Sequence, residues 1–532
     1  MSTPENNPDK AAKVFADDRA NVFHSWSAQG QISPMTVAGG AGSYFWDFNG
    51  KKYLDFSCQL VFTNIGHQHP KVISAIKEQA DILATVAPQH ANEARNEAAK
   101  VFADDRANVF HSWSAQGQIS PMTVAGGAGS YFWDFAGKKY LDFSCQLVFT
   151  NIGHQHPKVI AAIKEQADVL ATVAPQHANE ARNEAAKRIT GVAGDSFKKV
   201  FFTNGGADGI ENAIRMARLH TNKHKVLSTY RSYHGNTGSA INATGDPRRF
   251  PNEFGYGHVH FWGPYLYRTA FWATNQEEEC QRALEHLEQT IIFEGPKTIA
   301  AILIESVPGT AGVLVPPAGY LDGLRALCDK YEILWIADEV MSGFGRTGKW
   351  FGFQHSKSIP DLIVFAKGVT SGYIPLGGVI IPEKVAKTFD ERVFPGGLTY
   401  SGHPIACATA VATIDVMKSE KMVENAASIG EKILGPGLNE LAKKHQVIGD
   451  IRGAGVFWGV DMVTDRKTRE PLAPYGASSP KMNEIVATCK KNGLMPFNNF
   501  NRIHMVPPCN ISEADAKLGL ELLSKSLTEV GL

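Results

Sequence analysis

Ionisable side chains stand directly after several apolar runs of the sequence. Glu305 follows TIAAILI, Asp338 follows EILWIA, and Lys367 follows DLIVFA. In open α/β sheets, ligands bind beyond the carboxyl ends of the strands, so we expect these carboxylates and this amine to face one crevice. Taken singly, each side chain is also typical of an ion pair or of a solvated loop.

A glycine pair follows another apolar run, KVFF, in the turn TNGGADG. Gly205 and Gly206 free the backbone there, and the spacing of the next apolar residues predicts a helix whose N-terminus can bind a phosphate. Those apolar residues are Ile210, Ala213, Ile214 and Ala217. A lone Gly-Gly pair is equally consistent with an ordinary tight turn between a strand and a helix.

Taken together, these groups match the needs of one cofactor, pyridoxal 5'-phosphate (PLP). PLP requires a lysine for its Schiff base, a carboxylate against its pyridine nitrogen and backbone donors for its phosphate. Tyr233 and His234, in YRSYHG, follow a further candidate strand and offer an aromatic ring that can stack on the cofactor. The sequence therefore predicts a PLP site.

The elements that position these residues alternate as an α/β fold requires. KVFF, KVLSTY, TIAAILI, EILWIA and DLIVFA are near-continuous apolar runs, which is typical of strands covered by helices on both faces of a mostly parallel sheet. IRGAGVFWGVDMV and RIHMVPP predict strands of a smaller α+β domain. We expect an N-terminal appendage at 1–100, a first part of the small domain at 101–157, the large domain at 158–434 and the rest of the small domain at 435–532.

Composition narrows the classes of function. The 532 residues hold 53 basic (Lys and Arg) and 53 acidic (Asp and Glu) side chains, so no basic excess points to nucleic acid or an anionic membrane surface. Small molecules are the expected partners. Seven scattered cysteines without a C-x-x-C pair, together with a polar N-terminus, favour a cytoplasmic protein.

One segment occurs twice in tandem. Val14–Lys100 recurs as Val101–Lys187 with only three differences: Asn49 against Ala136, Ser74 against Ala161, and Ile82 against Val169. Only the second copy runs directly into RITGVAGDSFKKVFFTN, and docking the first copy instead would extrude a long loop. We therefore expect the second copy to fill the N-terminal site. The first copy, with apolar residues such as Trp26, Phe45 and Trp46, is expected to be a loosely ordered appendage or a segment that competes across a dimer.

The chain resembles the class III (omega-amino acid type) PLP-dependent aminotransferases over about residues 101–532. WIADEVMSGFGRTGKW, FAKGVTSGYIPLGGV, TNGGADGIENAIRMAR, YHG and TYSGHP occur in the order of that family and at close to its spacing. The resemblance implies a fold type I PLP-dependent transferase that forms a homodimer with shared active sites.

The resemblance also implies roles for the matching residues around the cofactor ring. Lys367 is implied to be the Schiff-base lysine, and Asp338 to pair with the pyridine nitrogen. Val340 is implied to pack under the ring and Tyr233 on its opposite face. Glu305 is implied to belong to the network near the ring.

The phosphate is implied to bind at Gly206 and Ala207, and Thr399 to reach the phosphate of the neighbouring subunit. Many relatives carry a serine at the position of Ala207, so this chain relies more on backbone donors and on Thr399. Looser cofactor binding is the expected consequence.

The substrate pocket is implied to include Val148, Phe149, Tyr233 and Thr310. Its apolar lining suits an arylalkyl or aliphatic amine, although core packing explains Val148 equally well. Many relatives place a mobile arginine for the substrate carboxylate where Phe497 stands here. Arg502 is the nearby cation. Two interpretations are open: it binds the substrate carboxylate, or it is a surface arginine at the end of a strand.

The resulting prediction is a ping-pong aminotransferase that moves an amino group from an amine or omega-amino acid to a keto acid, with pyruvate expected. A decarboxylase or aminomutase on the same scaffold remains an alternative, as does a non-catalytic PLP-binding protein.

Three other motifs are weaker candidates for function. The stretch Gly343–Lys349 satisfies G-x-x-x-x-G-K, but Trp350 stands where a P-loop NTPase needs Ser or Thr, which disfavours that class. GHQHP lacks a third ligand at zinc spacing and is interpreted as a turn, so no metal is expected. AGGAG after MTV is interpreted as a hairpin loop.

Overall fold

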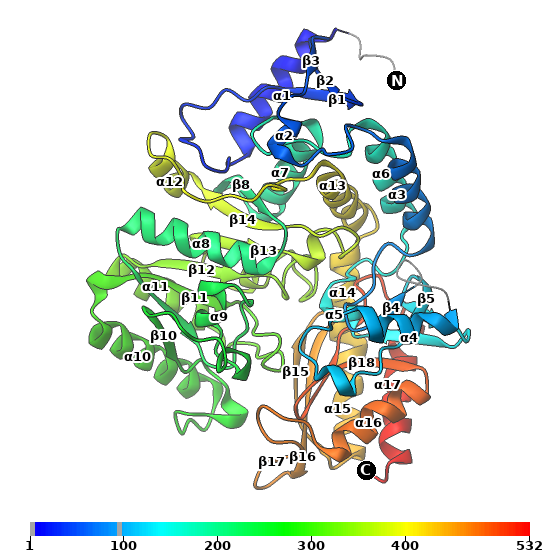
Figure 1. Cartoon of the computed structure of the whole chain (residues 1–532). Coiled ribbons are helices and arrows are strands. Elements are labelled where there is room, and N and C mark those ends of the chain that lie inside the picture. The colour runs from blue at the N-terminus through cyan, green and yellow to red at the C-terminus, as the bar shows by residue number, and fades with distance from the viewer. Residues whose placement is uncertain (1–5, 93–97) are drawn as a thin grey trace.

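A seven-stranded sheet forms the centre of the computed structural model, which describes residues 6–92 and 98–532 (Figure 1). The strand order is β10-β9-β11-β12-β13-β14-β8, and all neighbours are parallel except at β14, which is antiparallel to both of its neighbours. The strands are β8 (Phe197–Thr203), β9 (Lys225–Thr229), β10 (His258–Phe261), β11 (Ile299–Glu305), β12 (Leu334–Asp338), β13 (Leu362–Phe365) and β14 (Gly377–Pro382). The five strands expected in this sheet are confirmed.

Apolar side chains cover both faces of this sheet, as the unbroken apolar runs predict. Ile336 and Val364 point to the face that packs under α8 (Gly206–Thr221), whereas Trp335 and Ile363 belong to the core on the other face. The helices that contribute to this second core are α7 (Glu180–Ala193), α10 (Gln276–Glu294), α11 (Tyr320–Tyr331) and α13 (Pro404–Ser419). The strands are thus held between two helical layers.

A second sheet combines the C-terminal strands with strands of the second copy and with β4 of the first copy. Its order is β15-β16-β19-β18-β7-β6-β5-β4, with β17 (Glu470–Pro471) beside β16. β18 (Leu494–Asn499) pairs in parallel with β7 (Lys139–Phe143), which joins the C-terminal strands to the second copy. The others are β4 (Ala91–Asn92), β5 (Thr123–Ala128), β6 (Tyr131–Asp134), β15 (Ile448–Ala454), β16 (Phe457–Asp465) and β19 (Arg502–Met505). Two helices, α16 (Pro480–Lys491) and α17 (Glu513–Glu529), pack on it.

The first copy is packed onto the large domain, in contrast to the loosely ordered appendage that we expected. Its helix α1 (Pro8–Asn21) lies against α7 and β8, and Asp18 in it forms an ion pair with Arg182 at 3.3 Å. Phe23 then enters a cluster of aromatic rings with centroids 5.4–6.1 Å apart, made with Phe201, Phe389 and Phe394. The first copy therefore has a partner surface of its own.

The expectation that one copy would exclude the other failed because the copies dock at different places. The first copy supplies the helix on α7, and the second supplies the strands of the small sheet, so neither position forces an 87-residue loop out of the fold. The first copy also forms its own sheet from β1 (Val37–Ala41), β2 (Tyr44–Asp47) and β3 (Lys52–Leu54). Phe45 and Trp46 are buried there, while Trp26 stays half exposed.

We predict that Phe23→Ala lowers the free energy of unfolding by about 3–5 kcal/mol, the usual cost of removing a buried phenylalanine. The repeat provides a matched control, because Phe110 occupies the same position in the second copy and is 85% exposed. Phe110→Ala should change stability by less than about 0.5 kcal/mol. Thermal unfolding of both variants measures the difference, and equal effects would contradict the docking of α1.

Candidate active site

Three ionisable groups meet at the carboxyl edge of the central sheet, as the sequence predicts. Glu305 and Asp338 end the neighbouring parallel strands β11 and β12 and are register partners. Lys367 follows β13, the next strand across the sheet, and begins a short 3₁₀ turn. Both carboxylates are buried, so the amine and the two acids interact with little screening by water.

The Lys367 amine lies in a desolvated and backbone-strained position. Burial lowers its pKa to about 8, although the negative charges of Asp338 and Glu305 partly oppose this shift. Its backbone φ is 49°, a conformation that a residue other than glycine rarely adopts. Among the described residues, no ion-pair partner holds this amine, which leaves it free to react.

Asp338 is fixed from two sides. Its Oδ2 lies 2.7 Å from His234 Nδ1, and its Oδ1 accepts a hydrogen bond from the backbone N–H of Val340 at 3.0 Å. The other ring nitrogen of His234, Nε2, is buried and has no hydrogen-bond partner in the described part of the chain. The His234–Asp338 pair therefore presents a carboxylate whose orientation is set before any ligand arrives.

Glu305 is held by two backbone N–H groups, from Tyr233 at 3.2 Å and from Gly309 at 2.7 Å. Burial, and next the charge of Asp338, raise the pKa of Glu305 above its usual range. A carboxyl group that holds its proton near neutral pH can both donate and accept hydrogen bonds.

The first turn of α8 forms the predicted phosphate cup. No side chain among the described residues caps this helix at Gly205, so the backbone N–H groups of Gly206 and Ala207 remain available to an anion. A Cβ on Gly206 would lie 2.9 Å from Val340, and a Cβ on Gly235 would lie 2.5 Å from that of Ala207. Glycine at both positions lets the backbone walls of the cup approach closely.

These residues fit PLP. The unpaired lysine, the oriented carboxylate and the free N–H groups of a helix N-terminus are the three groups that this cofactor needs. Val340 lies against Gly206 at the edge of the cup, where the resemblance places it under the ring.

Tyr233 carries a contact that the sequence analysis missed. The Arg248 guanidinium lies 3.5 Å from the centre of the Tyr233 ring, and the Trp113 ring meets the same tyrosine edge-on at 6.2 Å. Arg248 also forms an ion pair with Asp246. No motif marks Arg248, because its place over the tyrosine depends on how the loop after α9 (Gly238–Ala243) folds back.

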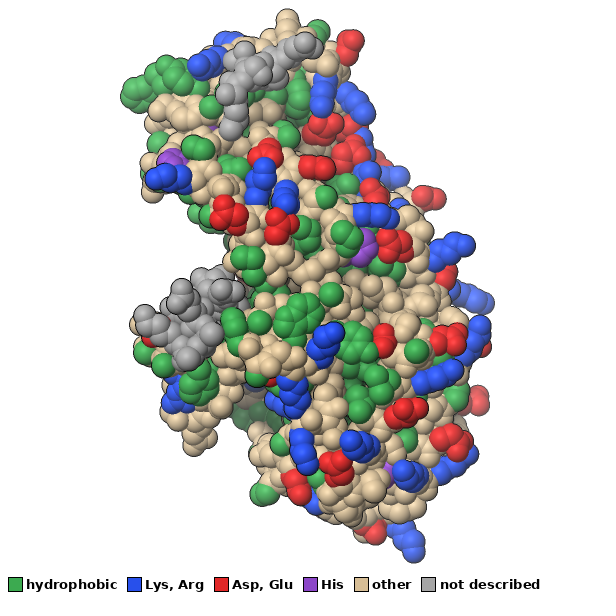
Figure 2. All heavy atoms as spheres, turned by 90° about the vertical axis from the view of Figure 1, so that its right-hand side faces the viewer, with side chains coloured by type: hydrophobic (Ala, Val, Ile, Leu, Met, Phe, Trp, Pro, Cys, Tyr) green, Lys and Arg blue, Asp and Glu red, His purple; other side chains and the backbone are tan. Residues whose placement is uncertain are grey.

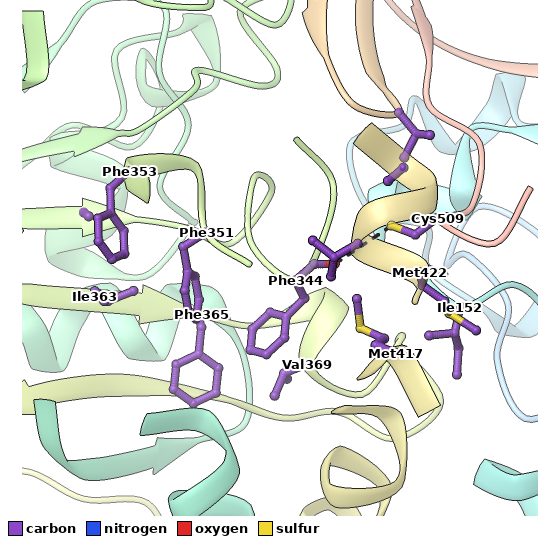
Figure 3. Close-up of a cluster of buried hydrophobic side chains, with 14 of the residues drawn as sticks. Ile152, Phe344, Phe351, Phe353, Ile363, Phe365, Val369, Met417, Met422 and Cys509 are labelled. Carbon is purple, nitrogen blue, oxygen red and sulfur yellow. Dashed lines mark hydrogen bonds between the residues drawn. The ribbon is translucent and has the colours of Figure 1, made fainter. Parts of the chain in front are cut away.

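A buried aromatic layer supports the loop of Lys367. Phe344 contacts Phe351 and Phe365 with ring centroids 5.3 and 6.1 Å apart, and Figure 3 shows Val369 beside Phe344. Arg346, in the stretch that matches G-x-x-x-x-G-K, is fully buried and donates hydrogen bonds to Asn151 Oδ1 at 2.6 Å and to a backbone carbonyl. That stretch therefore joins buried segments of the fold through Arg346 and is not a nucleotide-binding loop.

Val148 lies in a strained loop beside the site. Its φ is 60°, unusual for a β-branched residue, and its side chain packs with Val313, Phe457 and Val506. Burial opposes ionisation of Asp142, but hydrogen bonds from His154 and Ser144 lower its pKa, and Asp142 also accepts from the backbone of Gln146. Val148 therefore packs as a core residue. Its strained backbone lies next to Gln146, which the hydrogen bond to Asp142 holds in place.

Phe149 lies against the backbone after Lys367, because a Cβ on Gly372 would come within 2.3 Å of its ring. Thr310 is buried, and its hydroxyl lies 3.4 Å from Met341 Sδ, one residue after Val340. These contacts bring Phe149 to the loop that carries Lys367 and Thr310 to the segment that carries Asp338 and Val340.

Arg502 is buried, so the alternative of a surface arginine is wrong. Its Nη1 donates to Ala311 O at 2.7 Å, and desolvation lowers the pKa of Arg502 to about 10, so it remains charged at neutral pH. Arg502 lines a hollow together with Arg231, Arg249, Arg268 and Asp461.

Thr399 lies in the loop before α13. In the described part of the chain its side chain makes no hydrogen bond to the other expected site residues. The neighbouring Tyr400 instead meets Phe62 of the first copy edge-on at 5.6 Å.

Comparison with known proteins decides the family. The family model described as Aminotransferase class-III matches residues 26–116 and 112–527. The chain belongs to the class III aminotransferases. It is 34% identical to 5-aminovalerate aminotransferase DavT of Pseudomonas aeruginosa over 78% of this chain and 95% of that protein. It is 33% identical to a taurine–pyruvate aminotransferase of Rhodobacter capsulatus, over 76% and 90% respectively.

A solved structure of a class III enzyme agrees with this assignment. The taurine:2-oxoglutarate aminotransferase of Bifidobacterium kashiwanohense, in complex with PLP and glutamate, superimposes with a TM-score of 0.79 at 41% identity, over 81% of this chain and 98% of that one. The expected α/β transferase fold, the aminotransferase activity and the PLP cofactor are therefore confirmed. A decarboxylase or aminomutase is not favoured. Among the residues that the structure describes, no helix is both long and apolar enough to cross a membrane.

For this class III aminotransferase without cofactor, we predict that Lys367 reacts with amine-directed reagents with a midpoint near pH 8, the pKa that its burial produces. Asp338→Asn should move the midpoint below 8, because the Asp338 charge raises the pKa of the amine. Peptide mass spectrometry across a pH series measures the midpoint for Lys367. Asp329→Asn, which removes an exposed carboxylate, is the control. A midpoint near that of a solvated lysine would contradict the desolvated site.

Proposed function

We propose that this enzyme moves an amino group from an amine or omega-amino acid to a keto acid, pyruvate, by a ping-pong mechanism. The observation that carries the proposal is the unpaired Lys367, with its lowered pKa, beside the oriented Asp338. The taurine–pyruvate aminotransferase among its relatives supports pyruvate as the acceptor.

Each residue at the strand ends has a defined task in this proposal. Bound PLP supplies an electron sink for the bond that is broken at the substrate carbon. Asp338 would face the pyridine nitrogen and keep it protonated, and His234 keeps that carboxylate oriented. Lys367 would hold the cofactor, and its amine would accept and donate the proton that moves at the substrate carbon. A pKa of about 8 lets the amine act as either base or acid near neutral pH.

The remaining predicted contacts complete the site in this proposal. Gly206 and Ala207 bind the phosphate through backbone N–H groups, and Val340 and Tyr233 pack on the two faces of the ring. Glu305 holds the network beside the ring. This proposal keeps the expected bounds of the large domain, 158–434, and of the two parts of the small domain, 101–157 and 435–532.

The substrate side of the proposal rests on the apolar surroundings. Val148, Phe149, Tyr233 and Thr310 line the amine pocket, and Arg502 binds the carboxylate of the keto acid. The buried, permanently charged guanidinium of Arg502 supports this role, because a carboxylate is its natural partner.

We further propose that the working form is a cytoplasmic homodimer in which Thr399 reaches the phosphate of the neighbouring subunit. The next residue, Tyr400, meets Phe62 of the first copy, and this contact of the Thr399 loop with another segment supports a role across an interface. The seven free cysteines support a reducing compartment.

Lys367→Ala should abolish both steady amino transfer and the covalent attachment of PLP, because it removes the amine beside Asp338 at the edge of the sheet. Lys349→Ala is the control: it removes an exposed lysine from the G-x-x-x-x-G-K stretch and should leave turnover unchanged. Alanine formed from pyruvate and the absorption spectrum of the cofactor are the measurements. Turnover in Lys367→Ala would reject the proposed role.

Arg502→Ala should raise the KM for pyruvate about tenfold or more, because a charge-assisted hydrogen bond contributes at least 1.4 kcal/mol. The KM for a simple amine without a carboxylate should stay nearly unchanged. Arg502→Lys, which keeps the charge but not the bidentate geometry, should fall between the two. Equal changes for both substrates would show that Arg502 acts only through structure.

A further inference from the structure

The two copies of the repeat contact each other through equivalent residues. Helix α3 (Pro70–Ile82) of the first copy lies beside α6 (Pro157–Val169) of the second (Figure 1). Gln68 Nε2 donates to Ala167 O at 2.7 Å, and Gln155 Nε2 donates to Ala80 O at 2.9 Å. Gln155 is the repeat of Gln68, and Ala167 is the repeat of Ala80. The second contact is therefore the first one with the copies exchanged.

Further polar contacts show the same exchange. Ala171 N donates to Gln68 Oε1 and Ala84 N donates to Gln155 Oε1, both at 2.8 Å. A second exchanged pair, three residues further along these loops, joins Ala174 N to Gln59 Oε1 and Ala87 N to Gln146 Oε1, both at 2.9 Å.

Two ion pairs follow the same rule on the surface. Lys77 Nζ lies 2.6 Å from Asp168 Oδ2, and Lys164 Nζ lies 2.6 Å from Asp81 Oδ2. Figure 2 shows basic and acidic side chains interspersed over the face of the molecule that carries α3 and α6.

Each copy also completes the apolar core of the other. Val37 and Phe45 of the first copy pack with Leu170 and Val173 of the second. The mirrored cluster pairs residues of the second copy, Val124 and Phe132, with Leu83 and Val86 of the first. At the sheet edges Ala178 pairs with Thr36, and Ala91 pairs with Thr123.

A contact in which residue i meets j while the equivalent of j meets the equivalent of i is an isologous, two-fold contact. Because the copies are nearly identical, two separate chains with one copy each could form the same contact. We propose that the first copy occupies, within its own chain, the two-fold interface of the aminotransferase and takes the place of a partner subunit. This inference rests on the homodimer proposed above.

The exposed residues of the first copy support this assignment. Phe56 is 91% exposed where its repeat Phe143 is fully buried, and Val61 is 81% exposed where Val148 is 1% exposed. The body of the subunit covers Phe143 and Val148, whereas no described part of the chain covers Phe56 and Val61. This face of the first copy is therefore like the interface segment of a subunit without the rest of that subunit.

The loop of Thr399 supports the same conclusion. Phe62 of the first copy, the repeat of the pocket residue Phe149, meets Tyr400, and the backbone N–H of Trp26 donates to Gly396 O at 3.0 Å. The first copy therefore brings its own version of the pocket loop to the place where Thr399 would meet a neighbouring active site.

Covalent tethering decides the competition between the first copy and a free subunit. A segment in the same chain acts at an effective concentration on the order of 1 mM, about 100-fold above a chain concentration of about 10 µM. The same surface cannot hold both occupants. We therefore expect the full chain to stay monomeric at micromolar concentration and a chain without the first copy to dimerise.

Deletion of Val14–Lys100 tests this directly, because it joins Lys13 to Val101 and so retains the Lys-Val junction of the sequence. Light scattering after size exclusion should give the mass of one chain, 57.9 kDa, for the full protein and twice its own mass for the deletion protein. A full chain that dimerises as tightly as the deletion protein would overturn the inference. A folded but monomeric deletion protein would overturn the homodimer as well.

Charge reversal in the full chain provides a second test that keeps every residue in place. Lys77→Asp with Asp81→Lys sets like charges against Asp168 and Lys164, which loosens the first copy but leaves the second copy intact for dimerisation. The association constant for the dimer should rise about tenfold. Adding Lys164→Asp and Asp168→Lys restores opposite charges and should restore the monomer.

An unchanged mass distribution in the variant with Lys77→Asp and Asp81→Lys would contradict the inference. The masses of these proteins do not depend on turnover. If the masses are as expected but the full chain shows no amino transfer, the result counts against the proposed function alone.

Discussion

The arrangement of the site depends on the removal of water from three ionisable groups at one edge of a parallel sheet. Removing a charge from water costs several kcal/mol per ion unless neighbouring groups compensate for it. The cost is visible in the lowered pKa of Lys367 and the raised pKa of Glu305. His234 and a backbone N–H provide compensation at Asp338, so this carboxylate keeps a fixed position among buried neighbours.

The rest of the large domain maintains this desolvated edge. Helical layers on both faces bury the strands, and the aromatic layer around Phe344 supports the turn in which Lys367 adopts its strained backbone. The Arg346–Asn151 hydrogen bond connects the same region to the second copy of the repeat. The pocket loop that carries Val148 is therefore coupled to the loop of the lysine.

The sequence was most informative where the signal is local. A strand that ends in Asp338 or Lys367 is an apolar run followed by a charge, and such a pattern needs no knowledge of distant contacts. The strained pocket loop has the same shape in both copies, since Gln59 and Val61 adopt nearly the same positive φ angles as Gln146 and Val148 although Val61 is exposed and Val148 is buried.

Features that depend on tertiary packing could not be predicted. AGGAG predicts a loop, whereas Gly126 lies within β5. The Trp133 ring lies so close to Gly126 that only a residue without a Cβ fits there. Arg248 reaches Tyr233 only through the fold of a loop. Near-identical sequences predict competition of the two copies for one place, whereas each copy occupies its own because their neighbours in the chain differ.

The central claim is that Lys367, alone among the lysines of the chain, bonds covalently to PLP at this edge of the sheet. The most direct measurement is borohydride reduction of the protein mixed with one equivalent of PLP, followed by peptide mass spectrometry. The account predicts the added mass of the cofactor on the peptide that contains Lys367 and its loss in Asp338→Asn protein, where the ring is no longer held. A principal adduct on any other lysine would contradict it.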